Sequence, residues 1–473
     1  MNDNYRINCN FDCLSSINII DKKSNILLNS DEYNISTDSR SIKENDIFIA
    51  LKGKNSDGHN FLLQAFQNGA SVAIISEKIF FEELNFPLIL VQDTFSTLST
   101  IANYNFKDLK PLKIAITGSV GKTTTKDYLN NVLSYYEPTF SAPESFNNEL
   151  GITLAKAKLS KVDKYAIFEV GMNMKDEIRY LSNLINPDIS IITNIGEAHI
   201  GNLGSKENIA IEKSSIIEGM SRDGIVLLPR DDEYFELLRK NVLSKKLKYI
   251  TFGHSNKSDI QISKMTRGSD GVFIEFRVFG EVFKAHSNLQ NISILNNYLP
   301  VLGIANILNY DLDEVLKNIV TSKVHESRWQ ELDFELNCRQ VKLIDDTYNA
   351  SPTSMFEAIK AIDEYKSEQI IRKIIIIGDM LELGDFSEEY HLKLVNLINK
   401  TNIDQVYFCG ECLTSLFDMV SSKKRKKQFG SISDFCSIED FRLVGGDLIF
   451  IKGGNKIGLN KLVQEFINYL RLS

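Results

Sequence analysis

The sequence predicts an α/β protein of three domains: a small α/β N-terminal domain, a central, mostly parallel sheet covered by helices, and a C-terminal α/β domain. The chain has 473 residues, which is enough for about three domains of roughly 150 residues each. Apolar runs of strand length alternate with amphipathic stretches over the second and third blocks of the chain, a pattern typical of parallel sheets. A glycine-rich loop follows the first apolar run of the second block.

The first block, residues 1–108, is expected to form the small N-terminal domain. Strand-like pieces at residues 46–51 and 73–75 enclose a helical pattern at residues 61–68. Pro111 then opens a new section, so the predicted boundary lies between residues 108 and 109.

The second and third blocks, residues 109–325 and 326–473, both alternate strands with helices. In the second block the expected strands are residues 113–117, 166–170, 189–193 and 225–228, and the expected helices are residues 123–136 and 205–220. In the third block the expected strands are residues 341–344, 373–377, 405–408 and 448–451, and the expected helices are residues 354–365 and 460–470. Short apolar runs of this kind are typical of strands buried on both faces.

Charge and hydropathy exclude several classes of protein. The net charge of −8 argues against a general nucleic-acid or membrane-surface binder. The densest basic run, residues 423–427, is predicted to be a solvent-exposed loop. The polar start predicts no signal peptide, and no stretch approaches the ~18 consecutive apolar residues of a membrane span. We therefore expect a cytoplasmic protein.

Cysteine usage indicates no metal or disulfide framework. Cys409 and Cys412 have the spacing of a redox or zinc half-site, but no second Cys/His pair stands at a zinc-like distance in the sequence. The expected role of the cysteines is that of small buried hydrophobic residues. The six are Cys9, Cys13, Cys338, Cys409, Cys412 and Cys436.

The strongest chemical signal is a phosphate-binding loop between the first strand and the first helix of the central block. The loop glycines let backbone N–H groups wrap phosphate oxygens, and the N-terminus of the following helix adds partial positive charge. Lys122 can reach the terminal phosphates, and the Thr123 hydroxyl can bind magnesium. Ile116 stands where the usual first glycine would fall, so the loop is a shortened form. It reads Thr117-Gly118-Ser119-Val120-Gly121-Lys122-Thr123-Thr124.

Lys213 is a second unusual position. It shares one face of the expected helix at residues 205–220 with Ile209, Ile216 and Ile217. Ser205 is the expected N-cap of this helix. On an apolar face a lysine usually packs its stem and extends its ammonium into water, and this is the simpler interpretation from spacing alone.

Several motifs, in the same order, resemble those of the Mur ligases and their folyl-polyglutamate synthetase relatives. The shortened phosphate loop is one of them. The stretches Asp345-Asp346-Thr347-Tyr348-Asn349-Ala350-Ser351-Pro352 and Gly378-Asp379-Met380-Leu381-Glu382-Leu383-Gly384 resemble the branch that adds D-alanyl-D-alanine. The other matching stretches are Thr37-Asp38-Ser39-Arg40, residues 46–53, Asp57-Gly58-His59 and Phe146-Asn147-Asn148-Glu149-Leu150-Gly151. One departure is Asn288-Leu289-Gln290-Asn291, where the family has Gly-x-His-Asn.

The resemblance implies a central P-loop ATPase-like domain and a Rossmann-like C-terminal domain. It implies that D-alanyl-D-alanine is joined to a UDP-N-acetylmuramoyl-tripeptide in peptidoglycan synthesis, with ATP and Mg²⁺. The γ-phosphoryl group would turn the substrate carboxylate into an acyl phosphate, a reaction that needs charge neutralisation rather than a nucleophilic triad. The expected partners are these small molecules, with no nucleic acid and no membrane span, and the expected state is a monomer.

The resemblance also assigns roles to residues. The implied catalytic set is Lys122, Glu169, His199, Lys213 and Arg328. The implied magnesium ligands are Thr123, Glu169, His199 and Lys213, the last as a carbamate made from carbon dioxide. Besides the phosphate loop, the implied ATP contacts are Asn291, Arg328, Asp346 and Asn349. The implied contacts with the UDP-linked substrate are Thr37, Ser39, Arg40, Asn147 and Asn148.

Three alternatives stay open at the level of the sequence. One is another amide ligase of the superfamily, either the diamino-acid-adding enzyme or a polyglutamate synthetase, although Tyr348-Asn349-Ala350-Ser351-Pro352 argues against both. The second is a nucleotide-dependent switch that only hydrolyses ATP, and the third is a catalytically inactive relative. The sequence does not indicate whether the third residue of the substrate peptide is diaminopimelate or lysine.

Overall fold

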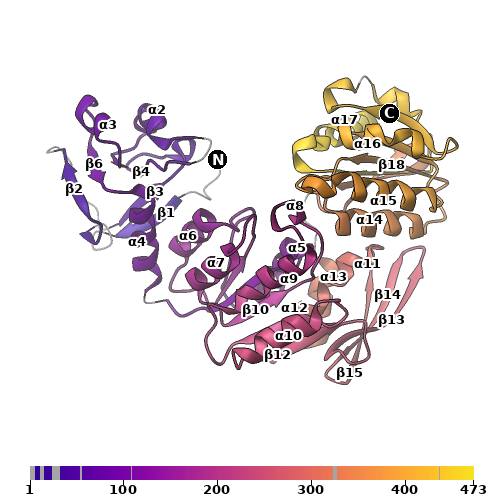
Figure 1. Cartoon of the computed structure of the whole chain (residues 1–473), viewed down its shortest axis with the longest axis horizontal. Coiled ribbons are helices and arrows are strands. Elements are labelled where there is room, and N and C mark those ends of the chain that lie inside the picture. Colours follow the sequence, from indigo (N-terminus) through magenta and orange to yellow (C-terminus); the bar gives the residue numbers. More distant parts are fainter. Residues whose placement is uncertain are drawn as a thin grey trace. The chain divides into compact units, whose positions relative to one another are not determined.

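The computed structural model describes residues 6–10, 15–23, 32–53, 56–107, 109–322, 327–435 and 437–472. The chain divides into two compact units, one of residues 1–114, 136–170 and 183–186, the other of residues 115–135, 171–182 and 187–473. Three sheets follow one another along the sequence, which confirms the expected α/β organisation (Figure 1). The expected boundaries, at residue 108 and at residues 325–326, fall outside the described residues.

The first sheet has the strand order β1-β3-β4-β5-β6-β2. Its parallel strands are β3 (Glu32–Ser36), β4 (Ile47–Ile49), β5 (Val72–Ile75) and β6 (Leu88–Val91). Its antiparallel edges are β1 (Arg6–Asn10) and β2 (Ile19–Lys22). The helices of this part are α2 (Leu62–Gln67), α3 (Lys78–Glu83) and α4 (Thr94–Phe106). Phe48, Ala73 and Leu88 belong to the core of this sheet.

The second sheet has the order β15-β14-β13-β12-β11-β10-β7-β9-β8. Its strands are β7 (Leu112–Thr117), β8 (Thr139–Ser141), β9 (Tyr165–Glu169), β10 (Ile189–Ile192), β11 (Ile225–Pro229), β12 (Lys248–Gly253), β13 (Ile260–Gly268), β14 (Gly271–Val278) and β15 (Glu281–Ser287). β10 to β13 pair in parallel, whereas β13, β14 and β15 form an antiparallel ribbon that the sequence pattern did not predict.

The helices of this central part include those that later carry the site residues. They are α5 (Lys122–Tyr136), α6 (Glu149–Lys158), α7 (Glu177–Ile185), α8 (Ile200–Leu203), α9 (Lys206–Ser214), α10 (Phe235–Ser244), α11 (Ile292–Leu295), α12 (Tyr298–Ile307) and α13 (Leu312–Thr321). The expected helix at residues 205–220 is α9 followed by a 3-10 turn, Ser215–Ile217, and Ser205 caps it as predicted by accepting a hydrogen bond from the Asn208 N–H.

The third sheet has the order β16-β17-β21-β18-β19-β20. Its strands are β16 (Gln330–Leu336), β17 (Arg339–Asp346), β18 (Arg372–Gly378), β19 (Gln405–Cys409), β20 (Arg425–Phe429) and β21 (Asp447–Lys452). Its helices are α14 (Pro352–Glu364), α15 (Ser387–Asn399), α16 (Glu411–Ser415) and α17 (Leu459–Leu472). α14 and α15 lie on one face of the sheet and α17 lies on the other (Figure 1). On the α17 face, Phe466 packs with Ile376 and Ile449 in one core.

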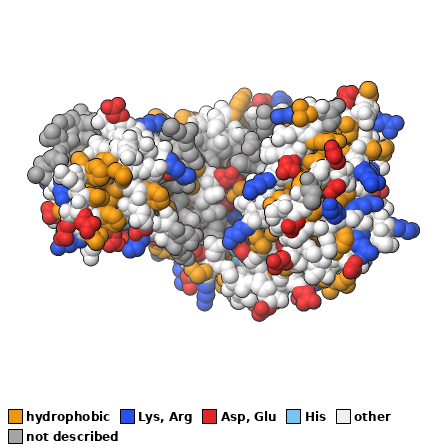
Figure 2. Space-filling model, turned by 90° about the horizontal axis from the view of Figure 1, so that it is seen from above, with side chains coloured by type: hydrophobic (Ala, Val, Ile, Leu, Met, Phe, Trp, Pro, Cys, Tyr) orange, Lys and Arg blue, Asp and Glu red, His pale blue; other side chains and the backbone are white. Residues whose placement is uncertain are grey.

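The basic run at residues 423–427 is not a loop throughout, because Arg425 begins the edge strand β20. Lys424 is also not simply solvated, since its Nζ donates a hydrogen bond to the backbone oxygen of Ile398 at 2.9 Å. Basic and acidic side chains are interspersed over the face seen in Figure 2. Within the basic run, Arg425 pairs with Asp418 and Lys427 pairs with Asp440, so acidic side chains partly neutralise it.

The cysteines fit the expectation only in part. Cys409 is buried and Cys412 is partly buried, but Cys338 is exposed, and all three are free thiols. Cys13, Cys436 and the side chain of Cys9 lie outside the described residues. Among the residues described, no helix is both long enough and apolar enough to cross a bilayer.

Candidate nucleotide and metal site

The predicted phosphate loop lies between the end of β7 and the start of α5. Gly118 (φ +154°) and Gly121 (φ +83°) both adopt backbone conformations that favour glycine. A Cβ at Gly118 would lie 1.8 Å from Thr193 Oγ1, and a Cβ at Gly121 would lie 2.2 Å from Asn297 Oδ1. Both positions therefore require glycine, which explains the spacing of the shortened loop.

Residues that follow β10 brace the loop from outside. Asn194 makes two hydrogen bonds with Val120, accepting from its N–H at 2.9 Å and donating to its carbonyl at 2.9 Å. Thr193 Oγ1 donates to the same carbonyl at 2.6 Å. Ser119 Oγ donates to Gly196 O at 2.9 Å and accepts from Gly196 N–H at 2.8 Å. The loop is thus held in one shape by its neighbours, and the bracing role of Asn194 was not foreseen in the sequence.

The reactive side chains of the loop lie at its helical end. Lys122 Nζ donates to Gly118 O at 2.9 Å, so its ammonium lies over the loop. Thr123 is buried in the first turn of α5, Thr124 is partly buried, and Thr117 is buried at the end of β7. Backbone N–H groups and partial positive charge at the start of α5 favour an anion there.

A cavity of about 270 Å³ opens beside the loop. Val120 and Gly121 line it on the loop side, and Phe252 and Pro300 supply apolar walls. Its polar lining includes Asp231, His254 and Asn296, and the His254 Nε2 lies 2.8 Å from Asn296 Oδ1. The lining is mixed, since the carboxylates of Asp232 and Glu357 also belong to it, and apolar walls beside hydrogen-bonding groups suit a nucleoside.

Lys213 is buried on α9, with 2% of its surface exposed. Ile209, Ile216 and Ile217 are buried with it, as the helical spacing predicted. Because the whole side chain is buried, its ammonium does not extend into water, and the snorkelling interpretation is wrong. Burial, together with the nearby Lys122 ammonium, holds the pKa of Lys213 well below its ordinary value of 10.5. This is an unusual environment for a lysine, because an unpaired buried ammonium is costly.

His199 follows β10 and faces the C-terminal domain. Its Nδ1 lies 2.8 Å from Glu382 Oε2, although off the line of an ideal hydrogen bond. The interaction with His199 lowers the pKa of the Glu382 carboxyl. The sequence placed both residues in motifs but gave a role only to His199.

Glu169 ends β9 as predicted and is 6% exposed. Its Oε1 accepts a hydrogen bond from Asn147 Nδ2 at 3.1 Å. Asn148 Oδ1 accepts from the Gly151 N–H at 2.9 Å and so caps α6. The two neighbouring asparagines therefore have different roles within this compact unit. Asn147 contacts the candidate metal ligand Glu169, and Asn148 caps the N-terminus of α6.

The three C-terminal residues expected to meet ATP lie near one another. The Arg328 guanidinium lies 3.6 Å from the centre of the Tyr348 ring, so it stacks on this ring. Lys452, to which the sequence assigned no role, is buried and pairs with Asp346 Oδ2 at 2.7 Å. It also donates to the backbone oxygen of Asn349 at 2.9 Å. Lys452 thus fixes the loop that follows β17.

The remaining expected contacts have local partners. Asn291 is buried and caps α11 by accepting a hydrogen bond from the Ser293 N–H. In the N-terminal domain, Ser39 Oγ donates to Gln64 Oε1 at 2.7 Å, and Thr37 is partly buried. Arg40 is exposed and pairs with Asp38 at 2.7 Å, and this contact lowers the pKa of Asp38. Arg40 is accessible to an anionic ligand, whereas Ser39 is largely enclosed.

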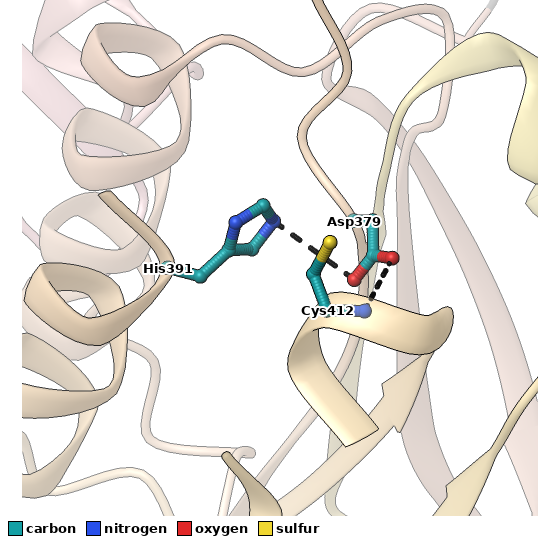
Figure 3. Close-up of side chains that lie close together, drawn as sticks. All are labelled: Asp379, His391 and Cys412. Atoms are coloured by element: carbon teal, nitrogen blue, oxygen red, sulfur yellow. Dashed lines mark hydrogen bonds and ion pairs between the residues drawn. The ribbon is translucent and has the colours of Figure 1, made fainter. Parts of the chain in front are cut away.

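Asp379, His391 and Cys412 form a second polar cluster, in the C-terminal domain (Figure 3). Both Asp379 oxygens accept backbone N–H groups at the start of α16, from Cys412 and Leu413, each at 2.9 Å. His391 Nε2 accepts from the Met380 N–H at 2.9 Å, and its Nδ1 donates to the Ser387 carbonyl at 2.7 Å. Because both imidazole nitrogens and both carboxylate oxygens already serve the backbone, we interpret the cluster as a brace rather than a metal site.

Three family models match the chain in sequence order. Residues 32–103 match the catalytic domain of the Mur ligase family. Residues 116–305 match the Mur ligase middle domain, and residues 328–454 match the Mur ligase glutamate ligase domain. Together they include strands of all three sheets.

Two curated relatives share the length of the chain. The UDP-N-acetylmuramoyl-tripeptide–D-alanyl-D-alanine ligase of Bacillus subtilis (strain 168) is 30% identical over 450 residues, covering 92% of this chain and 93% of that protein. The ligase of the same name from Buchnera aphidicola subsp. Baizongia pistaciae (strain Bp) is 32% identical over 449 residues, covering 92% of each. Among solved structures, MurF from Acinetobacter baumannii superposes with a TM-score of 0.81 at 26% identity, over 92% of this chain and 93% of that one.

Proposed function

The chain belongs to the Mur ligase family, and from this premise we propose that it joins D-alanyl-D-alanine to a UDP-N-acetylmuramoyl-tripeptide at the expense of ATP. The observation that carries this function is similarity over nine-tenths of the chain to ligases of that one specificity. The preformed phosphate loop and the Asp346–Asn349 loop held by Lys452 supply matching local features. In this reaction an amide bond forms, and ATP is converted to ADP and phosphate.

The phosphate loop performs the first half of the reaction. Its backbone N–H groups and the start of α5 hold the phosphates of ATP, and Lys122 neutralises charge on the terminal phosphates. The γ-phosphoryl group passes to the terminal carboxylate of the tripeptide and gives an acyl phosphate. The neutral α-amine of D-alanyl-D-alanine then attacks the acyl carbon, and inorganic phosphate leaves with the C–O bonding electrons. The cavity beside Val120 holds the nucleoside end of ATP.

Magnesium fits the donors that the resemblance assigns. Hydroxyl, carboxylate and carbamate oxygens are hard ligands, and a histidine held through Nδ1 keeps Nε2 for a metal. We propose Thr123 and Glu169 as ligands of the magnesium ion that binds the ATP phosphates, and His199 and carbamylated Lys213 as ligands of a second one. When bound, Mg²⁺ neutralises charge on the phosphoryl group.

Lys213 is the group we propose to carry a carbamate. A neutral amine captures carbon dioxide by forming an N–C bond and releasing a proton, and the lowered pKa of Lys213 favours the neutral amine. Burial among isoleucines also disfavours a bare ammonium, which a modified, metal-bound side chain avoids.

The function is tested by phosphate release. Phosphate should appear quickly only when ATP, Mg²⁺, the UDP-linked tripeptide and D-alanyl-D-alanine are all present, and EDTA should abolish it. The rate should rise from pH 7 into the mildly alkaline range, because the attacking α-amine has an ordinary pKa of roughly 8. Equal turnover with a UDP-linked dipeptide and free diaminopimelate or lysine would assign the chain to another branch. Parallel assays with both tripeptides identify the third residue.

The carbamate is tested by chemical rescue. Lys213→Ala should be nearly inactive and should regain part of its activity with acetate, whose carboxylate can occupy the vacated anion site. Exposed Lys240→Ala is the control and should respond to neither change. With ¹³C-bicarbonate, a carbamate signal should appear in the unaltered protein and be absent from Lys213→Ala. Full activity of Lys213→Ala would end this proposal.

The same proposal places the protein in the cytoplasm, where ATP is supplied, and makes it a monomer that acts on small molecules without nucleic acid. Sedimentation at micromolar concentration, with and without both substrates, tests the monomeric state. A stable dimer that is required for turnover would contradict it.

A further inference from the structure

Two loops of unusual backbone geometry meet beside the candidate metal site. His199 (φ +66°) lies in the loop after β10, and Glu382 (φ +63°) lies in the loop after β18. Residues with a Cβ rarely adopt this left-handed conformation, and they persist in it where the surroundings hold them there. The side chains of these two residues contact each other, His199 Nδ1 lying 2.8 Å from Glu382 Oε2.

The backbones of the two loops are also in direct contact. The Gly201 N–H donates to the Glu382 carbonyl at 3.2 Å. A Cβ at Gly201 would lie 2.7 Å from Gly384 N and 2.8 Å from Glu382 O. Because no side chain fits between the loops, the position of the Glu382 backbone is set relative to His199.

The loop that carries Glu382 is rigid at its base. Asp379 caps α16 through two backbone N–H groups, and His391 accepts the Met380 N–H. The Gly454 N–H donates to the Asp379 carbonyl at 3.0 Å, which ties the loop to the end of β21. Figure 3 shows this brace, with Asp379 between His391 and the start of α16. Glu382 is therefore presented from a fixed support.

We propose that the Glu382 carboxylate positions His199. It holds the proton on Nδ1 of the imidazole and turns Nε2 toward the metal. Contact with the C-terminal domain thereby completes the metal site of the central domain. Carboxylates that hold the second nitrogen of a metal-binding histidine fix its tautomer and its orientation. The inference rests on the proposed function, in which His199 binds Mg²⁺.

An ordinary surface ion pair is the competing explanation. Half of the Glu382 side chain is exposed, and exposed ion pairs add little to stability. Removal of Glu382 should therefore leave the unfolding temperature unchanged under either explanation. Metal binding separates the two, since an ordinary surface pair would not affect it.

The experiment uses Mn²⁺ with ADP on the full chain. Pulsed electron paramagnetic resonance should show coupling to an imidazole nitrogen in the unaltered protein and none in His199→Ala. Glu382→Ala should weaken Mn²⁺ binding about tenfold and diminish the nitrogen coupling. Glu382→Gln, whose amide oxygen can still accept from Nδ1–H, should recover part of both. Exposed Asp385→Asn, three residues along the same loop, is the matched control and should behave as the unaltered protein.

Two results would overturn the inference. One is Mn²⁺ affinity and nitrogen coupling in Glu382→Ala equal to those of Asp385→Asn. The other is the absence of imidazole coupling from the unaltered protein. Failure of the proposed function is distinguishable, because it appears as missing phosphate release with D-alanyl-D-alanine. If phosphate release is missing but the imidazole nitrogen coupling still depends on Glu382, the positioning role is supported and only the ligase specificity is refuted.

Discussion

Lys122 carries a positive charge to the place where the terminal phosphates of ATP are held, at the start of α5. Lys122→Ala should lower kcat/KM about 100-fold or more, because charge that develops in the transition state loses its partner. Its Nζ donates to the loop carbonyl of Gly118, and the side chain is only half-buried, so the unfolding temperature should hardly change. Phosphate release with all substrates measures the rate, with exposed Lys175→Ala as the control. Retention of more than half the activity would refute the assignment of the loop.

Residues of the site were predictable from the sequence where they belong to a motif or to a helical spacing of apolar residues. The spacing of Gly118, Gly121 and Lys122 identified the phosphate loop, and helical spacing placed Lys213 on an apolar face. Lys452 and Glu382 escaped because their partners, Asp346 and His199, are distant in sequence. Asp346 meets Lys452 only because β17 and β21 pair in register, which requires the strand order of the sheet.

Strands were predictable from the sequence where both of their faces are buried. β18 and β21 pair in parallel and are buried, and an apolar run fills the centre of each, residues 374–377 and 448–451. The ribbon of β13, β14 and β15 was missed because charged residues alternate with apolar ones along it, as in β14 with its Glu275 and Arg277. Such alternation is weak evidence for a strand until the neighbouring strands are known.

The brace beneath Glu382 should respond to acid through His391. Burial lowers the pKa of His391 below its ordinary value of 6.5, and protonation would also remove the lone pair that accepts the Met380 N–H. Below pH 6.5 the His391 imidazole binds a proton in the unfolded chain, whereas in the folded chain it stays neutral until the pH is lower. The stability this neutral imidazole provides is therefore complete above about pH 6.5 and declines as the pH falls, by at most about 1.4 kcal/mol per unit.

Unfolding by urea between pH 7.5 and 5.5 measures this effect. His391→Gln should be less stable at pH 7.5, because the Gln side chain cannot reproduce both hydrogen bonds of the imidazole. Its free energy of unfolding should nevertheless vary less with pH than that of the unaltered chain. Parallel curves for the two proteins would show that another group causes the acid dependence.

At the scale of the larger compact unit, contacts at two separate places, among others in the described residues, join the central and C-terminal domains. One set comprises His199 and Gly201 with Glu382, together with the Thr353 hydroxyl, which donates to the Glu197 carboxylate. The other set lies at the end of α14. There Arg267 pairs with Glu364 at 2.5 Å, and Gln290 makes two hydrogen bonds with the backbone of Lys366. Gln290 stands where the resemblance leads us to expect a histidine.

Gln290→Leu should loosen both sets of contacts. The buried Gln290 amide accepts the Lys366 N–H at 2.9 Å and donates to the Lys366 carbonyl at 2.6 Å. Loss of these bonds costs about 1–3 kcal/mol, which should speed hydrogen exchange at the Lys366 amide about tenfold or more. Since both sets hold the same two domains, hydrogen exchange at the Gly201 amide, which donates to the Glu382 carbonyl, should also become faster.

Mass spectrometry of peptides spanning residues 199–203 and 363–369 measures hydrogen exchange at both amides, with exposed Glu368→Gln as the control. An increase confined to residues 363–369 would show that the two sets act independently, and no increase at Lys366 would show that Gln290 does not hold the domains together.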